Sequence, residues 1–244
     1  MRARAVVAQA RIETLLTLRR GESVLVTLGI PLGILVFFAK VDTGTMFEDL
    51  DPVDFLVPGV LALAVMSTAM VSLGIATGFE RRYGVLKRLG STPLSRAGLL
   101  AAKTVNVLAI ELAQAAVILG TGIALGWEPS WRIAPATAVL LVGTIAFAGI
   151  GMLLAGTLRA DANLAVSNGL FLVLLFLGGM AYPLDQLPRA LELLGAALPA
   201  AALAESVRGV LDPSRGLPAG SFAVLVAWAV AAPLAASRWF RWEE

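Results

Sequence analysis

The sequence has 244 residues, of which 58% are hydrophobic and 15% are charged, and its mean hydropathy is +0.85. Soluble globular domains carry about 25% charged residues, so most of this chain is expected to lie in lipid. The chain has no cysteine and no histidine, which excludes disulfide bonds, thiol nucleophiles, the commonest zinc-ligand sets and histidine acid/base catalysis.

The first segment, 1–23, places arginines among aliphatic residues. This pattern predicts an amphipathic helix that lies on the membrane surface. A cleaved signal peptide is the alternative, but its charged region would be too long. In addition, no small-residue cleavage site follows the apolar stretch, which ends in Phe37, Phe38, Ala39 and Lys40. The sequence therefore favours a surface helix.

Six stretches that are uncharged or nearly uncharged follow along the chain. They cover residues 24–39, 55–79, 99–126, 133–158, 164–182 and 222–239. A helix needs about 20 apolar residues to cross a bilayer, and its backbone groups must be satisfied internally. The first stretch is short and contains Pro31, so its helix is expected to extend into the flanks. The expected fold is an all-α membrane protein with six transmembrane helices in one domain, 1–244.

An apolar segment at 187–211 separates the fifth and sixth stretches. It is interrupted by Pro188, Pro199, Glu205 and Arg208, and neither half is long enough to cross a bilayer. Irregular backbone is tolerated at membrane depth only where protein or water surrounds it. A re-entrant or surface helical hairpin therefore fits this segment best.

The distribution of basic residues predicts the orientation. Most of the 19 lysines and arginines fall before the first span, between the second and third spans, or at other positions on that same side. Basic residues accumulate on the cytoplasmic side of membrane proteins, so both termini are predicted to be cytoplasmic. Trp127, Trp131, Trp239 and Trp242 lie where interfacial aromatic residues are expected.

The most informative predicted cytoplasmic segment is 80–96. Tyr83, Leu86 and Leu89 recur at helical spacing opposite a charged face, while Thr92 followed by Pro93 is typical of a helix start. This pattern predicts a short amphipathic helix along the inner membrane surface. The alternative is a loop whose positive charge only fixes the topology.

Two motifs in this sequence resemble those of the ABC-2 type membrane permeases. The first consists of Glu80, Arg81, Gly84, Leu86, Leu89, Thr92, Pro93, Leu94, Ser95, Arg96 and Lys103. The second consists of Gly178, Gly179, Pro183, Leu184, Leu187, Pro188, Pro199, Glu205 and Arg208. The family commonly has Asn-Pro-Leu near its second proline, whereas this chain has Leu198-Pro199-Ala200. The resemblance covers essentially the whole chain.

The resemblance implies a coupling helix within 80–96 that docks on a separate cytoplasmic ATP-binding cassette ATPase subunit. Its contact residues would be Glu80, Arg81, Arg82, Tyr83, Gly84, Leu86, Lys87, Arg88 and Leu89. It also implies that 187–211 forms extracellular re-entrant helices. The outer gate would involve Pro183, Leu187, Pro188, Pro199, Glu205 and Arg208. ATP and Mg would bind the partner subunit, leaving this chain without cofactor, metal or catalytic residues.

The sequence supports this division of labour independently, because it contains no Gly-Lys dipeptide and hence no P-loop. The leading hypothesis is a bacterial inner-membrane permease that works as a dimer, with a second copy or a homologous permease. It would export a hydrophobic or amphipathic solute such as a drug, lipid or glycan, driven by ATP hydrolysis on the partner. Nucleic acid is not an expected partner.

Glu111 lies inside the third predicted span, where an ionised carboxylate costs free energy. An acid in such a position is a candidate functional residue. At roughly 100° per residue, Lys103, Asn106, Glu111, Gln114 and Thr121 fall within an arc of about 140°. Asn106, Glu111, Gln114 and Asn168 are therefore candidates for a translocation path. The alternative role is structural: interhelical hydrogen bonds for Glu111, and packing or helix capping for Asn168.

Two other classes of function remain open. An ion-coupled secondary transporter would use Glu111 as its proton site, although the sequence shows no evident internal repeat. An intramembrane enzyme would need a serine with a lysine, or a pair of acids within the bilayer. No second membrane-embedded acid is evident to pair with Glu111.

Overall fold

The computed structural model describes residues 11, 14–15, 21–41, 51–86, 96–130 and 132–241, without the side chains of 21–27 and 96–100. Within these ranges all regular elements are helices. Most of the predicted surface helix at 1–23 lies outside the described residues. So do Lys87, Arg88 and Leu89 of the predicted coupling helix, and Trp131 and Trp242.

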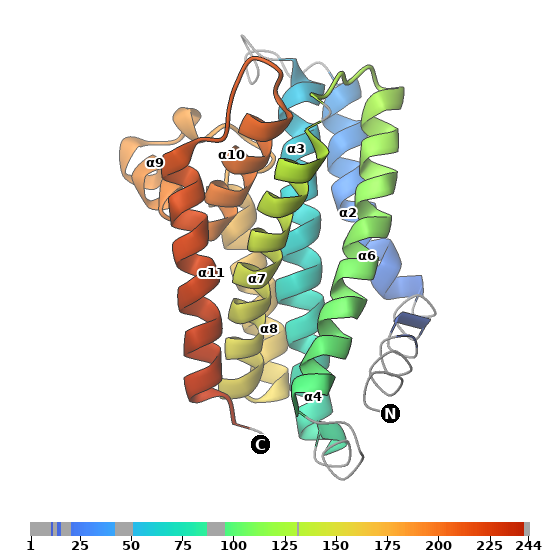
Figure 1. Ribbon diagram of the computed structural model, residues 1–244, viewed down its shortest axis with the longest axis vertical. Helices are drawn as coiled ribbons and strands as arrows, with labels where there is room; N and C mark the ends of the chain where they lie inside the picture. The colour runs from blue at the N-terminus through green and yellow to red at the C-terminus, as the bar shows by residue number, and fades with distance from the viewer. Residues whose placement is uncertain are drawn as a thin grey trace.

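The long helices run side by side along the longest axis of the molecule (Figure 1). They are α2 (Gly21–Lys40), α3 (Pro52–Val65) continued by the π-helix η2 (Met66–Ser72) and α4 (Leu73–Arg82), α6 (Arg96–Ala124), α7 (Ile133–Thr157), α8 (Ala160–Leu177) and α11 (Ala219–Trp239). Five of these are long and apolar enough to cross a membrane, and the described apolar part of α2, Leu28–Lys40, is shorter. The all-helical fold is thereby confirmed, with five helices able to span a membrane in the described part of the chain, or six if the bent pair at 189–211 counts as one span.

The second and fifth predicted spans differ most from the structure in their limits. The second runs over Pro52–Arg82 rather than 55–79, because Asp51 caps its start and Gly84, with φ of 67°, ends it. The fifth runs over Ala160–Leu177 rather than 164–182, since Asp161 is compatible with a helix first turn and Gly178 and Gly179 end the helix.

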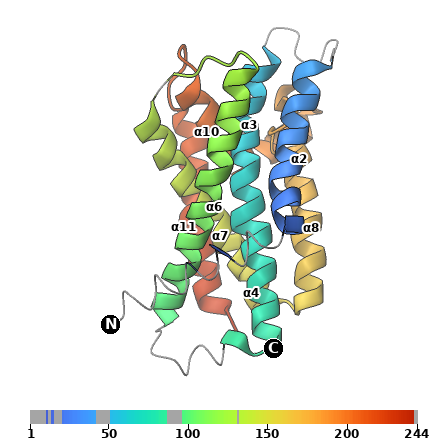
Figure 2. The ribbon, with the colours of Figure 1, turned by 90° about the vertical axis from the view of Figure 1, so that its right-hand side faces the viewer.

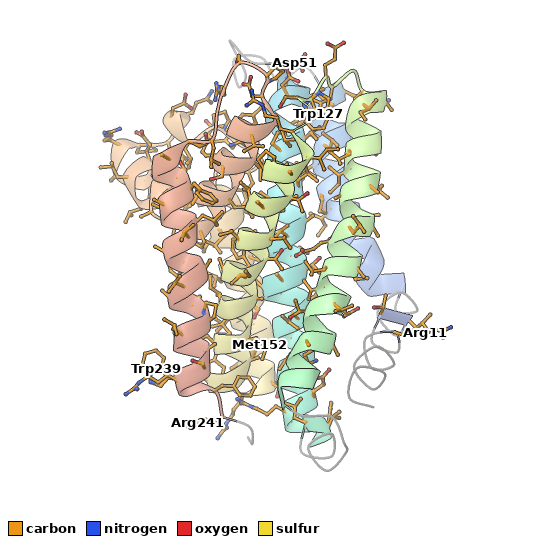
Figure 3. The ribbon with its side chains drawn as sticks, in the orientation of Figure 1. Arg11, Asp51, Trp127, Met152, Trp239 and Arg241 are labelled. Carbon is orange, nitrogen blue, oxygen red and sulfur yellow. The ribbon has the colours of Figure 1, made fainter. Side chains whose placement is uncertain are left out.

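The two ends of the bundle differ in the residues that they carry. Asp51 and Trp127 lie at one end, and Trp239 and Arg241 lie at the other (Figure 3). We call these the Trp127 end and the Arg81 end, because Arg81 contacts Arg241. The end of α4 and the start of α6 lie at the Arg81 end, whereas α9 and α10 lie at the Trp127 end (Figure 1).

The helix Pro52–Arg82 forms the centre of the bundle, and both views show α3 and α4 as one column (Figures 1 and 2). Of its most apolar 18-residue window, 83% is buried within the protein. Its middle turns widen into η2, where the Thr68 hydroxyl hydrogen-bonds with Gln114 Oε1 on α6 at 2.9 Å. Such π segments often occur at functional sites, and the sequence did not predict this one.

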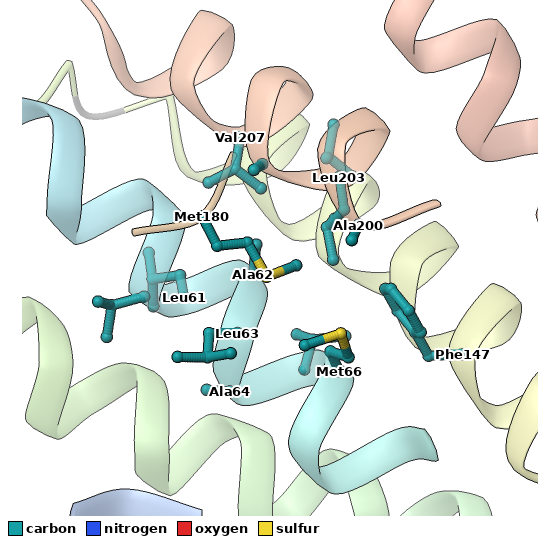
Figure 4. Close-up of a cluster of buried hydrophobic side chains, with 14 of the residues drawn as sticks. Leu61, Ala62, Leu63, Ala64, Met66, Phe147, Met180, Ala200, Leu203 and Val207 are labelled. Atoms are coloured by element: carbon teal, nitrogen blue, oxygen red, sulfur yellow. The ribbon is translucent and has the colours of Figure 1, made fainter. Parts of the chain in front are cut away.

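The predicted hairpin at 187–211 consists of two helices, α9 (Arg189–Ala196) and α10 (Pro199–Leu211), which meet at an angle of 78°. Pro199 occupies the first turn of α10, where its missing N–H is harmless. Helix α10 packs against α3, and Leu203 and Val207 join Leu61 and Met66 in the core (Figure 4). Helix α10 is therefore a core element at the Trp127 end of the bundle, whereas most residues of α9 are exposed.

Glycines let α4 approach its neighbours closely. A Cβ at Gly74 would lie 3.0 Å from the Gly151 carbonyl oxygen on α7, and a Cβ at Gly78 would lie 2.6 Å from Asn163 Nδ2 on α8. The Asn163 amide in turn donates to the Gly74 carbonyl oxygen at 2.9 Å, and its oxygen accepts from Ser167 at 3.1 Å. Asn163 therefore fastens α8 to α4.

Replacing Asn163 with alanine is expected to lower the free energy of unfolding by about 1–2 kcal/mol, because the buried Gly74 carbonyl and Ser167 hydroxyl both lose a partner. Thermal unfolding of the purified protein in detergent measures the change. Asn168→Ala is the matched control, since Asn168 is exposed and donates only to Leu164 of its own helix. Equal effects of the two variants would contradict this role for Asn163.

Candidate functional sites

At the Arg81 end, an ion pair joins α4 to α6. Lys103 Nζ lies 2.9 Å from Glu80 Oε1 and 2.7 Å from Oε2. The Lys103 side chain is only 6% exposed and that of Glu80 is 26% exposed. Because the protein encloses most of this pair, Glu80 is directed into the bundle rather than outward.

Arg81 ties α4 to two further segments at the same end. Its guanidinium donates to the carbonyl oxygens of Leu158 and Arg241, which follow α7 and α11. Arg82 points outward and pairs with Asp161 of α8 at 2.6 Å, with both side chains largely exposed. The end of α4 is thus fixed to α6, α7, α8 and the segment after α11.

The chain turns sharply directly after α4. Tyr83 is 63% exposed and stacks on Phe79, with ring centroids 6.1 Å apart. Gly84 adopts a left-handed conformation, and Leu86 is buried again. Glu80, Arg81 and Arg82 belong to α4, because its backbone hydrogen bonds continue to Tyr83. The coupling helix within 80–96 stays a prediction.

The polar stripe on α6 faces neighbouring helices. Gln114 contacts Thr68 of η2, and Glu111 Oε2 hydrogen-bonds with the Thr144 hydroxyl of α7 at 2.7 Å. Thr121 donates to the Val117 carbonyl oxygen of its own helix. Asn106 Oδ1 is enclosed and has no hydrogen-bond partner among the described residues. The predicted interhelical hydrogen bond of Glu111 is thus present.

Glu111 also lines a groove between α3, α6 and α7. The groove has a volume of about 340 Å³, and its wall is almost entirely aliphatic. Leu108, Leu112 and Leu140 line it together with Glu111, and Trp127 belongs to its lining at the Trp127 end. Asn168 does not join this site, because it lies exposed on α8 and bonds to Leu164.

At the Trp127 end, Arg208 of α10 connects three segments. Its guanidinium donates to the carbonyl oxygens of Phe55, Gly179 and Met180 and to Glu205 Oε1 at 2.7 Å. It also lies 3.6 Å from the centroid of the Phe55 ring, in a cation–π contact. Its side chain is 6% exposed. Arg208 is therefore a structural link between α10, α3 and the end of α8.

A cavity of about 530 Å³ opens beside Arg208. Its lining includes the predicted gate residues Pro183, Glu205 and Arg208, but not Leu187, Pro188 or Pro199. Six carboxylates and two arginines line it, and the carboxylates are Asp54, Glu128, Asp185, Glu192, Glu205 and Asp212. Hydrogen bonds from Ser214 hold the pKa of Asp212 below its usual value. We call this space the acidic cavity.

The sequence did not identify the partners of these polar residues. Phe55, Gly59, Thr68 and Thr144 are ordinary span residues by composition, yet Gly59 leaves the room in which Met180 and Arg208 approach α3. Spacing along one helix shows which side chains share a face, but not which helix lies opposite.

Five described helices that are apolar and long enough to cross a bilayer define a multi-pass membrane protein. The sequence profile of the family described as "ABC-2 type transporter" matches residues 5–211. The chain therefore belongs to the ABC-2 type transporter family, and it is an ABC permease component. Members of this family generally pair with ATP-binding cassette ATPase subunits. No curated protein matches the chain in sequence.

Proposed function

We propose that this protein is the membrane subunit of an ATP-driven exporter that moves a hydrophobic or amphipathic solute out of the cell. ATP and Mg are bound by a separate cytoplasmic ATPase subunit. The Arg81 end faces the cytoplasm of a bacterial cell, as the distribution of basic residues indicates. The functional unit contains two permeases, either two copies of this chain or this chain with a homologue.

The continuous helix Pro52–Arg82 is the observation that carries this proposal. At the Arg81 end it leads directly into the exposed Tyr83. At the other end its residue Phe55 contacts Arg208 beside the acidic cavity. Movement of the turn at Tyr83 by an ATPase would therefore be transmitted along one packed helix to the Trp127 end.

Within the predicted coupling segment, the residues divide into two groups. Glu80 and Arg81 hold the end of α4 against other helices, so they position the turn. Arg82 and Tyr83 are exposed and available to a partner. We also propose that the ATPase binds the remaining residues of this segment, which are Gly84, Leu86, Lys87, Arg88 and Leu89.

Tyr83→Ala is expected to weaken association with the ATPase at least tenfold, because it removes an exposed aromatic side chain of the kind that dominates interface energies. Co-purification and biolayer interferometry with the ATPase encoded beside this gene measure the association. Trp239→Ala is the matched control, since Trp239 is a similarly exposed aromatic residue at the same end. Unchanged association of Tyr83→Ala would count against the proposal.

Ion-coupled transport through Glu111 is the second candidate function, favoured by an acid within the span α6 that faces a groove. It predicts pH-driven flux in vesicles that contain this protein alone. Flux that requires both ATP and the ATPase would instead support ATP-driven export.

A further inference from the structure

One carboxylate oxygen of Glu111 lacks a partner. Oε2 contacts Thr144, whereas Oε1 is enclosed and has no hydrogen-bond partner among the described residues. The ion pairs of the described residues do not include Glu111. An enclosed polar atom of this kind costs free energy unless a ligand or partner satisfies it.

The groove around Glu111 has the shape and composition of a site for an amphiphile. Its wall consists mainly of leucine, alanine and valine side chains, with few polar groups, as in other small-molecule sites. Leu112 and Leu141 on its flanks are 74% and 41% exposed, so the groove opens sideways from the bundle. A ligand can therefore reach it from the membrane.

The charges along the groove favour a positive ligand at the depth of Glu111. Arg132 is the basic residue of the lining, and it is exposed at the Trp127 end, where it donates to the Arg215 carbonyl oxygen. At roughly 1.5 Å per residue, about 18 Å of α7 separates Arg132 from Thr144. Glu111 is therefore the acid of the inner part of the groove lining, and a cation beside it would favour its ionised form.

The groove adjoins the acidic cavity. Trp127 and Leu211 line both spaces and form the partition between them. Gly126, with φ of 97°, lets the chain fold back so that the Trp127 N–H donates to the Gly122 carbonyl oxygen at 3.0 Å. Among the carboxylates of the acidic cavity, Glu205 pairs with Arg208, Asp212 with Arg215 and Glu192 with Arg189. Three further carboxylates remain, Asp54, Glu128 and Asp185.

We propose that a rotation of the Glu111 side chain turns the enclosed Oε1 into the groove between α3, α6 and α7, which then binds a lipophilic amine. The ammonium group of the amine donates to this oxygen, and its apolar part lies among the aliphatic side chains. Displacement of Trp127 and Leu211 then lets the cation pass into the acidic cavity. An anionic amphiphile would meet carboxylates in both spaces, and a neutral one would leave Glu111 without a charge partner. The direction of passage rests on the proposed function, but binding does not.

Binding of tritiated dodecylamine and dodecanol to the purified protein in phosphatidylcholine nanodiscs, with empty discs subtracted, tests this proposal. The two probes share one chain and differ in charge at neutral pH. Dodecylamine is expected to bind at least tenfold more tightly than dodecanol. Glu111→Gln keeps the size of the side chain and a partner for Thr144, and it is expected to abolish that tenfold preference without weakening dodecanol.

Two bulky variants locate the site. Thr137→Trp fills the groove from an exposed position on α7 and is expected to weaken both probes at least fivefold. Leu164→Trp, at an exposed position on α8 outside the groove, is expected to change neither.

Equal binding of the two probes to the wild type, or full amine affinity in Thr137→Trp, overturns the proposal even if Glu111→Gln fails to fold. Retention of the amine preference by folded Glu111→Gln does so as well. These measurements use neither nucleotide nor ATPase. Failure of ATPase association therefore counts against the proposed function and leaves the amine site standing.

Discussion

Arg208→Ala is expected to lower the free energy of unfolding by about 3–5 kcal/mol, the largest loss among the changes considered for this protein. The substitution removes the Arg208 donor from the carbonyl oxygens of Phe55, Gly179 and Met180. It also leaves Glu205 without its cation. Each buried polar group that loses its partner adds a desolvation cost.

Thermal unfolding in detergent, followed by circular dichroism, measures the effect of Arg208→Ala. Arg189→Ala is the control, because Arg189 also pairs with a glutamate three positions away in the sequence, Glu192, but on an exposed surface. Arg208→Lys shows how much of the stability depends on the positive charge and how much on the hydrogen-bond geometry of the guanidinium. A lysine keeps the positive charge but not the planar fork that reaches several acceptors, so it should recover only a small part of the loss.

Equal stability of Arg208→Ala and Arg189→Ala would contradict this role of Arg208. It would show that water reaches the Arg208 side chain from the acidic cavity. The contacts to Phe55, Gly179 and Met180 would then contribute little, and α10 would be held mainly by apolar packing of Leu203 and Val207. The proposed transmission of movement from Tyr83 to the Trp127 end would then lack its final contact, the one between Phe55 and Arg208.

The sequence could predict the helices because hydropathy over about 20 residues is a local property. The six stretches and the bent segment at 187–211 all correspond to helices in the structure. The π-helix at Met66–Ser72 was not predictable in this way, because its contact with Gln114 depends on α6, far along the chain.

Charged residues near helix ends were harder to assign than the helices themselves. Glu80 and Arg81 have the composition of a solvated loop, but the structure directs both into the bundle. Their partners, Lys103 and the Leu158 carbonyl oxygen, lie on other helices. A family pattern gives the order of such residues, whereas the tertiary arrangement decides which of them are available to a partner protein.

Lys103→Met is expected to lower the free energy of unfolding by about 2–4 kcal/mol, because it leaves the Glu80 carboxylate partly buried without a cation. Glu80→Gln should have a similar effect, since Lys103 then remains charged in a site where it is only 6% exposed. The double variant should recover most of the loss, because an uncharged pair needs no ionic partner. Chemical unfolding of the four proteins gives the coupling energy.

Arg82 and Asp161 provide the matched cycle, because they form an ion pair at the same end of the bundle with largely exposed side chains. Their coupling energy should stay below about 1 kcal/mol. If the Glu80–Lys103 pair couples no more strongly than this, water must surround Lys103, and the end of α4 would move independently of α6. If it couples strongly while the double variant still binds the ATPase, the pair stabilises the turn at Tyr83 without contacting the partner. Strong coupling together with loss of binding would instead place Glu80 or Lys103 within the docking surface.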